Sequence, residues 1–304
     1  MIRLFTGTII LLLLACSTSF AQRSFPVGLK FSDFEYNKVP KRYFAVRGSR
    51  SMPMAHSLKQ YCPKPLNQLE LKTSSGWAAA YAALTIVMAE QNKWSKTEVM
   101  QNVYAPAYPV FKAKQKAGLD NPAELSLNQV IDALKEYGTP KYRQLPSRSL
   151  TSVSPEIEQK ARENRISEYA RLYEKLDTRL TKITAIKSTL NENLPVIIAM
   201  HTPKSFSYAE QFWQPREEFN KDIPGHALTI IGYDDSRYGG AFEVMNSWGS
   251  EWGNDGFMWI KYDDLIEFSE DAYDIYVIPG KTSGIELGGS IDLTLVKENA
   301  PMEV

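Results

Sequence analysis

The amino-acid sequence predicts an α+β protein built as two packed lobes, a helical lobe first and an antiparallel β lobe second, with a cleft between them. Patterns typical of helices dominate residues 75–193. Short β-branched and aromatic runs, separated by Gly and Asp turns, dominate residues 226–262. The chain has 304 residues, 43% of them hydrophobic, which is enough to bury a large core.

The composition excludes several classes of partner and site. The chain carries 35 basic and 35 acidic residues and no block of five like charges, so nothing in it attracts a polyphosphate. Its two cysteines and three histidines cannot build a zinc cage or a disulfide-rich scaffold. We therefore expect no nucleic acid, no metal and no cofactor.

The N-terminus predicts export to the periplasm or the extracellular space. Arg3 precedes an apolar run, Ile9–Ala15, and small residues end at Ala21, as in a signal peptide covering residues 1–21. A second processing site stays open, because Leu13–Cys16 resembles a bacterial lipobox that would leave Cys16 acylated as a lipoprotein anchor. No other apolar run is long enough for a transmembrane helix.

The first half of the mature chain reads as a lead-in followed by helices. Residues 22–60 are interrupted by prolines and lack helical periodicity, which predicts an extended lead-in before a main domain at 61–280. Residues 75–92 are apolar on nearly all sides and rich in helix formers, which predicts a buried central helix. Two capping boxes predict the starts of the next helices: Ser95 with Glu98, and Ser126 with Gln129.

A charged segment then interrupts the apolar pattern. Ser154 and Pro155 open it, and a one-sided apolar stripe predicts an exposed amphipathic helix to about residue 176, within a helical insertion at about 155–180. The charged face of this helix is either exposed to solvent only, or it docks a partner or covers the cleft. A further helix is predicted at 183–193, before the apolar run at 196–200. The tail, residues 281–304, alternates apolar and polar residues and suggests no function.

Two motifs in the second half carry chemistry. Gly225 and His226 open a strand, and Asn246-Ser247-Trp248-Gly249 follows twenty residues later. A lone histidine beside a glycine is more often structural, but the combination is specific. It resembles the second half of the papain-like cysteine peptidases, over residues 195–278. The resemblance implies that His226 supplies the imidazole, that Asn246 orients it, and that Trp248 shields their hydrogen bond.

The first half of that family's site has a different residue where the nucleophile belongs. In the family a Gln precedes the nucleophilic Cys by six positions, at the start of the central helix; here Gln68 is followed by Ser74. The segment through Trp77 resembles a secreted bacterial branch with a Cys-x-Gly-Trp motif, whereas alignment on a Cys-Trp pair would place Gly76 there. Neither alignment gives a cysteine. Cys62 lies twelve residues before Ser74, and we expect no catalytic role for it.

Two glycines of the family are also replaced. Leu69 follows Gln68, and Lys72 stands two residues before Ser74. Because glycines let a substrate backbone run close to a loop, we expect these two side chains to crowd the cleft. The lead-in is too short and irregular to form the helical propeptide usual in activated members of the family.

The resemblance implies the site residues Ser74, His226, Asn246 and Gln68, supported by Trp77 and Trp248. A serine hydroxyl cannot form the thiolate–imidazolium pair of a cysteine peptidase, so His226 would have to remove its proton during attack. Three hypotheses remain. The chain is a pseudopeptidase that binds a peptide or protein ligand in the cleft; or it is a slow Ser-His-Asn hydrolase with an oxyanion hole at Gln68 and the Ser74 amide; or these residues only satisfy one another in the core. The sequence predicts no oligomeric state.

Overall fold

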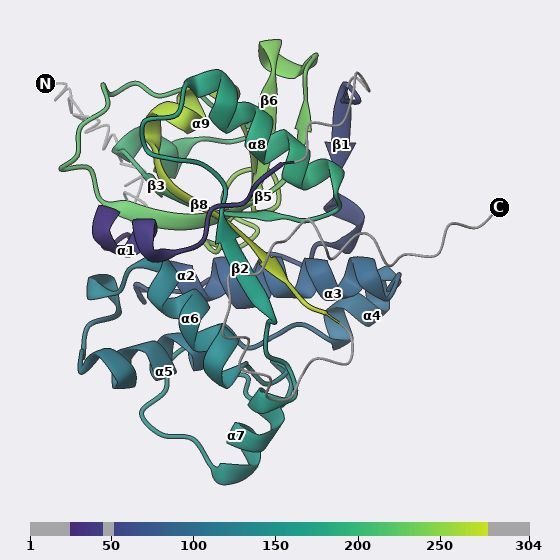
Figure 1. The fold of residues 1–304 in the computed structure, drawn as a ribbon, viewed down its shortest axis with the longest axis vertical. Helices are drawn as coiled ribbons and strands as arrows, with labels where there is room; N and C mark the ends of the chain where they lie inside the picture. The colour runs from purple at the N-terminus through teal and green to yellow at the C-terminus, as the bar shows by residue number, and fades with distance from the viewer. Residues whose placement is uncertain (1–24, 45–51, 279–304) are drawn as a thin grey trace, which may run out of the picture.

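One sheet organises the upper part of the molecule in Figure 1. The computed structural model describes residues 25–44 and 52–278. The strands lie in the order β2-β8-β3-β5-β6-β7-β4, with β1 also paired to β5, and each pair is antiparallel except β4 with β7. The strands are β1 (Ala55–Ser57), β2 (Glu168–Arg171), β3 (Val196–His201), β4 (Phe212–Trp213), β5 (Gly225–Asp234), β6 (Ala241–Met245), β7 (Phe257–Lys261) and β8 (Ser269–Tyr276).

Helices form the lower part of the molecule, and two more, Arg179–Asn191 and Tyr262–Phe268, lie in the upper part together with the sheet (Figure 1). The α-helices are α1 (Asp33–Lys38), α2 (Ser74–Gly76), α3 (Thr85–Gln91), α4 (Lys96–Gln101), α5 (Ala107–Ala117), α6 (Leu127–Tyr137), α7 (Pro155–Arg162), α8 (Arg179–Asn191) and α9 (Tyr262–Phe268). A π-helix, η2 (Trp77–Leu84), joins α2 to α3, and 3-10 turns occur at η1 (Lys59–Tyr61), η3 (Pro122–Glu124), η4 (Lys204–Tyr208) and η5 (Arg237–Gly239).

The predicted central helix is confirmed as the continuous run of α2, η2 and α3. Every residue of η2 is buried, which explains why its sequence is apolar on all sides. Both predicted capping boxes are also confirmed, one at the start of α4 and the other at the start of α6. The helix predicted at 183–193 is α8, which begins four residues earlier, at Arg179.

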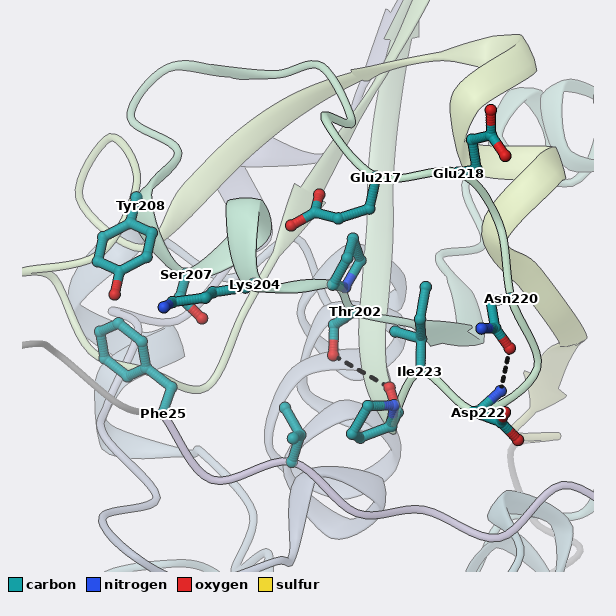
Figure 2. A pocket seen from close by; sticks show the side chains of 13 residues that line it. Phe25, Thr202, Lys204, Ser207, Tyr208, Glu217, Glu218, Asn220, Asp222 and Ile223 are labelled. Atoms are coloured by element: carbon teal, nitrogen blue, oxygen red, sulfur yellow. Dashed lines mark hydrogen bonds between the residues drawn. The ribbon is translucent and has the colours of Figure 1, made fainter.

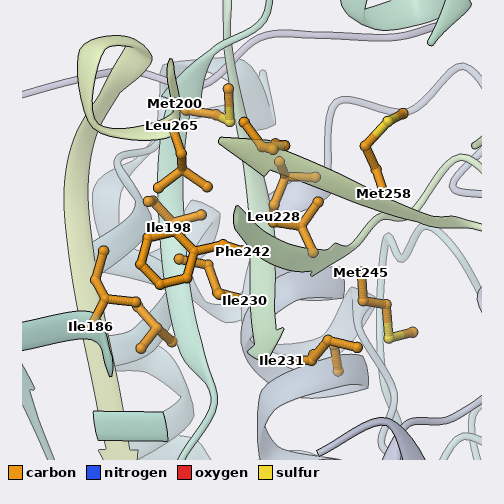
Figure 3. Close-up of a cluster of buried hydrophobic side chains, with 14 of the residues drawn as sticks. Ile186, Ile198, Met200, Leu228, Ile230, Ile231, Phe242, Met245, Met258 and Leu265 are labelled. Carbon is orange, nitrogen blue, oxygen red and sulfur yellow. The ribbon is translucent and has the colours of Figure 1, made fainter. Parts of the chain in front are cut away.

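The sheet buries both of its faces, so the central strands are apolar throughout rather than alternating. On one face, residues of β3 and β5 such as Ile198 and Leu228 pack with Leu265 of α9 (Figure 3). On the other, Ile197 and Ala199 of β3 pack in a cluster with alanines of the central helix. Small alanine side chains allow the helix to approach the sheet closely, and its first turn therefore lies against β5.

The lead-in is not extended throughout, contrary to the prediction. Residues 33–38 form α1, whose N-cap Ser32 accepts a hydrogen bond from the Glu35 amide at 3.3 Å. The helix is less than two turns long, which is too short for a periodic apolar pattern to show in the sequence. Tyr36, its buried residue, packs edge-on against Tyr273 of β8.

The prediction of one long helix from Pro155 to about residue 176 is wrong. The helix ends at Arg162, and residues 168–171 form β2, an edge strand paired with β8. The apparent one-sided stripe joined a helix to a strand: Ala161 is buried on α7, whereas Tyr169 is buried in β2 beside Tyr273. Strand pairing with β8 decided the structure here, against the local helical pattern.

Within residues 25–44 and 52–278, no helix is both long enough and apolar enough to cross a membrane. The predicted signal peptide, the lipobox alternative at Cys16 and the tail from residue 281 lie outside the described residues.

Candidate functional site

The first pair of site residues comes from two adjacent strands. His226 is the second residue of β5, and Asn246 directly follows β6, so the pairing of these strands brings the two side chains together. His226 Nε2 lies 2.8 Å from Asn246 Oδ1, which also accepts a hydrogen bond from the Ser247 amide at 2.7 Å. An amide oxygen only accepts, so Nε2 carries the proton and the other nitrogen, Nδ1, presents a lone pair. Nδ1 is buried and has no hydrogen-bond partner among the described residues.

Burial lowers the pKa of His226 to about 4, although the hydrogen bond with Asn246 partly opposes this shift. The imidazole is therefore neutral at pH 7. No described carboxylate contributes to its shift, and a neutral amide stabilises an imidazolium less than a carboxylate would. The arrangement is that of a base held in one tautomer.

Ser74 is the first residue of the central helix and faces β5. Its Oγ accepts a hydrogen bond from the Ala227 amide at 3.2 Å, one residue beyond His226. The described residues include no hydrogen bond between Ser74 and His226 themselves. Gly76 points the other way, because a Cβ on it would lie 2.2 Å from the Pro106 carbonyl oxygen in the helical lobe. Of the two residues that alignment offered, only Ser74 is directed toward β5.

Gln68 joins this cluster through its side-chain amide. Its Oε1 accepts a hydrogen bond from Ser247 Oγ at 2.6 Å, and its backbone amide donates to the Ser247 carbonyl at 2.8 Å. Its Nε2 donates to the Leu71 carbonyl and, at 3.4 Å, to that of Pro26. The structure thus gathers Ser74, His226, Asn246 and Gln68 at one place, while their catalytic roles remain predictions.

Two tryptophans support the cluster in different ways. Trp248 is fully buried, and its ring lies 4.6 Å from the His226 ring, which fits the shielding that the resemblance implied. Trp77 packs against Tyr81 of the same helix, at 5.0 Å between rings, in the core beneath the site. Trp77 is therefore a packing residue here.

The lead-in runs across the site, which the sequence did not predict. The Gly28 amide donates to the Gly225 carbonyl at 2.9 Å on the β side, and the Lys30 amide donates to the Leu125 carbonyl at 3.2 Å on the helical side. Phe25 stacks on Trp248, with 4.6 Å between rings and 8° between planes. These contacts are mostly made by backbone atoms, which carry no sequence signal.

As a result the site is closed. None of the side chains of Gln68, Ser74, His226, Asn246 and Trp248 is more than 3% exposed. The expected cleft between the lobes is therefore occupied by the chain's own residues 25–31, which we call the strap.

Leu69 and Lys72, which the resemblance places at two glycines of the family, behave differently from the expectation. Leu69 has φ of 58°, in the left-handed region that favours glycine, and its side chain is 51% exposed instead of crowding the cleft. Lys72 does contact the strap: a Cβ on Gly28 would lie 2.9 Å from Lys72 Cδ. Lys72 is nevertheless exposed, as Leu69 is, so the predicted crowding of the cleft is shown for neither residue.

Cys62 is remote from this chemistry. It is fully buried, its thiol is 3.5 Å from the Leu58 carbonyl, and burial raises its pKa to about 12. A thiol in such surroundings is unreactive at neutral pH. The described residues also contain no group of three His, Cys, Asp or Glu side chains that could hold a metal ion.

A pocket of 810 Å³ lies beside the strap (Figure 2). Phe25 and Tyr208 line one end of it, and Asn220 and Asp222 line the other. Pro224, directly before β5, joins this pocket to the strand that carries His226. The pocket therefore borders the site without opening onto it.

Comparisons with known proteins agree with this geometry. The profile of the papain family cysteine proteases matches residues 112–274, more than half of the chain, and so includes His226 and Asn246 but neither Gln68 nor Ser74. An uncharacterised peptidase C1-like protein of Acanthamoeba polyphaga mimivirus is 22% identical, over 73% of each chain.

Solved structures show the same fold. Xylellain, a cysteine protease from Xylella fastidiosa, superposes with a TM-score of 0.68 at 15% identity, covering 84% of this chain and 97% of that one. A digestive procathepsin L2 of Tenebrio molitor larval midgut superposes with a TM-score of 0.67 at 14% identity, covering 83% of this chain and 78% of that one. The predicted two-lobed α+β fold is confirmed.

Proposed function

Because the chain belongs to the papain family of cysteine proteases, we propose that it is a pseudopeptidase, which binds a peptide or protein segment in its cleft without cysteine-peptidase turnover. The observation that carries this proposal is Ser74, a serine at the start of the central helix, directed toward the strand of His226. The resemblance places the nucleophilic cysteine at this position.

The chemistry of the remaining residues supports the loss of turnover. A cysteine peptidase holds a thiolate beside an imidazolium before substrate arrives, because the thiol has a low pKa at a helix N-terminus next to a charged histidine. A serine hydroxyl is far less acidic. With its pKa at about 4, His226 is a neutral and weak base, and its orienting partner is an amide, not a carboxylate.

The contacts of the strap support peptide binding. The Gly225 and Leu125 carbonyls and the Gln68 amide each pair with a backbone group of residues 26–30. Backbone recognition of this kind is independent of side-chain identity, so another extended peptide would find the same partners. The strap occupies these partners and would compete with such a peptide.

A synthetic peptide that copies residues 24–32, SFPVGLKFS, tests the proposal. We expect it to bind the variant Gly28→Ala at least about tenfold more tightly than the wild type, because the substitution weakens the competing strap. Calorimetric titration measures both affinities. Gly118→Ala is the matched control: Gly118 also has a positive φ, of 65°, but a Cβ there meets nothing within 4 Å. If Gly28→Ala binds no better than this control, the cleft is not a peptide site.

A slow serine hydrolase is the second candidate, favoured by one observation. His226 Nδ1 presents an unpaired lone pair in the buried cluster, and Ser74 Oγ accepts a hydrogen bond from Ala227, which leaves its own proton to donate. Transfer of this proton would accompany attack by the oxygen. Labelling of Ser74 by a fluorophosphonate distinguishes this candidate from the pseudopeptidase.

We also propose that the protein acts outside the cytoplasm, from the signal-like residues 1–21. The mass of the mature N-terminus tests this. Cleavage after Ala21 would give a secreted protein, a lipidated Cys16 would give an anchored one, and an intact Met1 would contradict export.

A further inference from the structure

Lys141 lies in the turn that follows α6, and the backbone on both sides of it is fixed. The Ala105 amide donates to the Pro140 carbonyl at 2.9 Å, directly before Lys141. The Tyr142 amide, directly after it, donates to the Val103 carbonyl at 2.7 Å. The half-buried side chain of Lys141 therefore starts from a well-defined position.

The amino group of Lys141 lies among aromatic rings and meets one hydrogen-bond acceptor. Its Nζ donates to the Asn102 carbonyl at 3.1 Å. It lies 3.7 Å from the centre of the Tyr104 ring, which is fully buried, and 5.1 Å from that of the half-buried Trp94. An ammonium carries three N–H donors, and the described part of the chain offers an acceptor to one of them. These surroundings suit a nitrogen with fewer donors and no charge.

Lys175, another partly buried lysine, shows the opposite surroundings. Its Nζ lies 2.8 Å from Asp271 and 3.0 Å from Glu270. Burial alone would lower its pKa, but these carboxylates raise the pKa to about 12. No described carboxylate contributes at Lys141, where burial and then the charge of Arg143 lower the pKa to about 7. Aromatic ring faces attract an ammonium, but they stabilise it less than a carboxylate does.

We propose that Lys141 is a modification site, a nucleophilic amine that small activated acyl compounds such as acyl phosphates acylate in preference to the exposed lysines. The neutral amine attacks the carbonyl carbon, so that the N–C bond forms and the C–O bond to phosphate breaks. The phosphate leaves with the electron pair and takes up the amine proton. Arg143, an exposed cation two residues further on, favours the approach of an anionic donor.

The product of this reaction fits the site. Acylation removes the charge of Lys141 and leaves its nitrogen one N–H donor. The Asn102 carbonyl, the acceptor that the nitrogen already binds, can accept from that donor. Acylation therefore costs the protein none of the described hydrogen bonds of this amino group.

Reaction of the full chain with acetyl phosphate at pH 7 measures the preference. Peptide mass spectrometry gives the rate at each lysine, and the exposed Lys221 is the reference. At pH 7 about half of the Lys141 amines are neutral, against about one in 3,000 at the ordinary pKa of 10.5. A less basic amine is also a weaker nucleophile, as is known for thiols, so we expect Lys141 to react at least about tenfold faster. A rate no higher than that of Lys221 would overturn the proposal.

The pH dependence separates nucleophilicity from simple accessibility. From pH 7 to pH 9 the rate at Lys141 should rise only about twofold, because half of its amines are already neutral at pH 7. An amine with the ordinary pKa gains about 100-fold over the same range. A gain of that size at Lys141 would also overturn the proposal, even if its rate at pH 7 were high.

A matched pair of substitutions tests the missing counter-charge. Asn102 is the C-cap of α4, and its Nδ2 donates to the Glu98 carbonyl at 2.9 Å. Asn92 is the C-cap of α3, and its Nδ2 donates in the same way to the Met88 carbonyl at 2.8 Å. Asn102→Asp places a carboxylate on the residue that Lys141 binds, so the rate at Lys141 at pH 7 should fall at least about fivefold.

Asn92→Asp is the control and should change the rate at Lys141 by less than about twofold, because an exposed charge that is not on a residue bound by Lys141 is screened by solvent. The same rate in both variants would overturn the proposal, since the reactivity would then not depend on the absence of a carboxylate beside the amino group.

Discussion

The two halves of the site differ in how they relate to the family. The half on the β lobe keeps the histidine, the asparagine and the tryptophan, and it lies within the matched residues 112–274. In the half on the helical lobe, the resemblance implies departures from the family at Leu69, Lys72 and Ser74. The β half is also part of the core: Trp248 lies 5.4 Å from Trp252 and 5.6 Å from Phe206, ring to ring. The β half is therefore held by packing in the core; in the helical half Gln68 and Ser74 are buried as well, whereas Leu69 is exposed.

The largest expected effect comes from placing a cysteine at residue 74, where the resemblance implies the nucleophile. Ser74→Cys, in the background of Gly28→Ala to weaken the strap, should raise cleavage of a general peptide substrate at least about 10³-fold over Gly28→Ala alone. A thiol next to His226 at a helix N-terminus can ionise, and a hydroxyl cannot. Initial rates with a fluorogenic peptide measure it, and adding His226→Ala should abolish the gain. A double variant that stays inactive would mean that Lys72 and its neighbours no longer fit a substrate.

The second effect tests whether the β half is a packing unit. Trp248→Ala should lower the free energy of unfolding by about 3–5 kcal/mol, because it removes a fully buried indole. Urea denaturation measures the loss. Trp259→Ala, at a half-buried position of β7, should lower the free energy of unfolding clearly less than Trp248→Ala does. Equal costs would contradict the packing role of Trp248.

The third effect is a pH dependence located at His226. Its pKa is about 4 in the folded protein, below the ordinary value of 6.5, so the unfolded chain takes up a proton first as the pH falls. The stability from burying the neutral imidazole is therefore complete above about pH 6.5 and lost toward pH 4, by about 3 kcal/mol. Urea denaturation at pH 7 and pH 4 measures this, and His226→Gln should lose about 3 kcal/mol less over that range. The same loss in both proteins would assign the dependence to other groups.

The smallest effect distinguishes Leu69 from Lys72, the two positions at which the resemblance implies a glycine. Leu69→Gly should stabilise the protein by up to about 1 kcal/mol, because Leu69 is held at a positive φ and half of its side chain is exposed. Lys72 does not have a positive φ, and its side chain lies beside Gly28 of the strap. Lys72→Gly should therefore lower the free energy of unfolding by about 0.5–1 kcal/mol. Thermal unfolding compares the two, and changes of the same sign would contradict the distinction.

Local signals predicted the elements whose structure is decided locally. The capping residues Ser95 and Glu98 start a helix because they bond to each other, and β5 is a strand because its apolar run is buried on both faces. The strand at residues 168–171 was missed because its pairing partner, β8, lies about a hundred residues further on. The positions of His226 and Asn246 followed from their motifs.

The closure of the site followed from no motif. It depends on backbone groups of Gly28 and Lys30 meeting carbonyls on opposite lobes, and every residue type other than proline carries such groups. The resemblance implied a serine in place of the nucleophile, whereas no motif implied the segment that runs from one lobe to the other.

The reaction of Ser74 with a fluorophosphonate tests the central claim, that the cluster is assembled without a working nucleophile. The measurement uses Gly28→Ala, so that the strap does not protect the site, with mass spectrometry of the peptide that contains residue 74. We predict no modification of Ser74 above the background seen when Ser74→Ala is added. Modification of Ser74 that is lost in the Ser74→Ala variant would contradict the claim and identify the protein as a serine-dependent hydrolase.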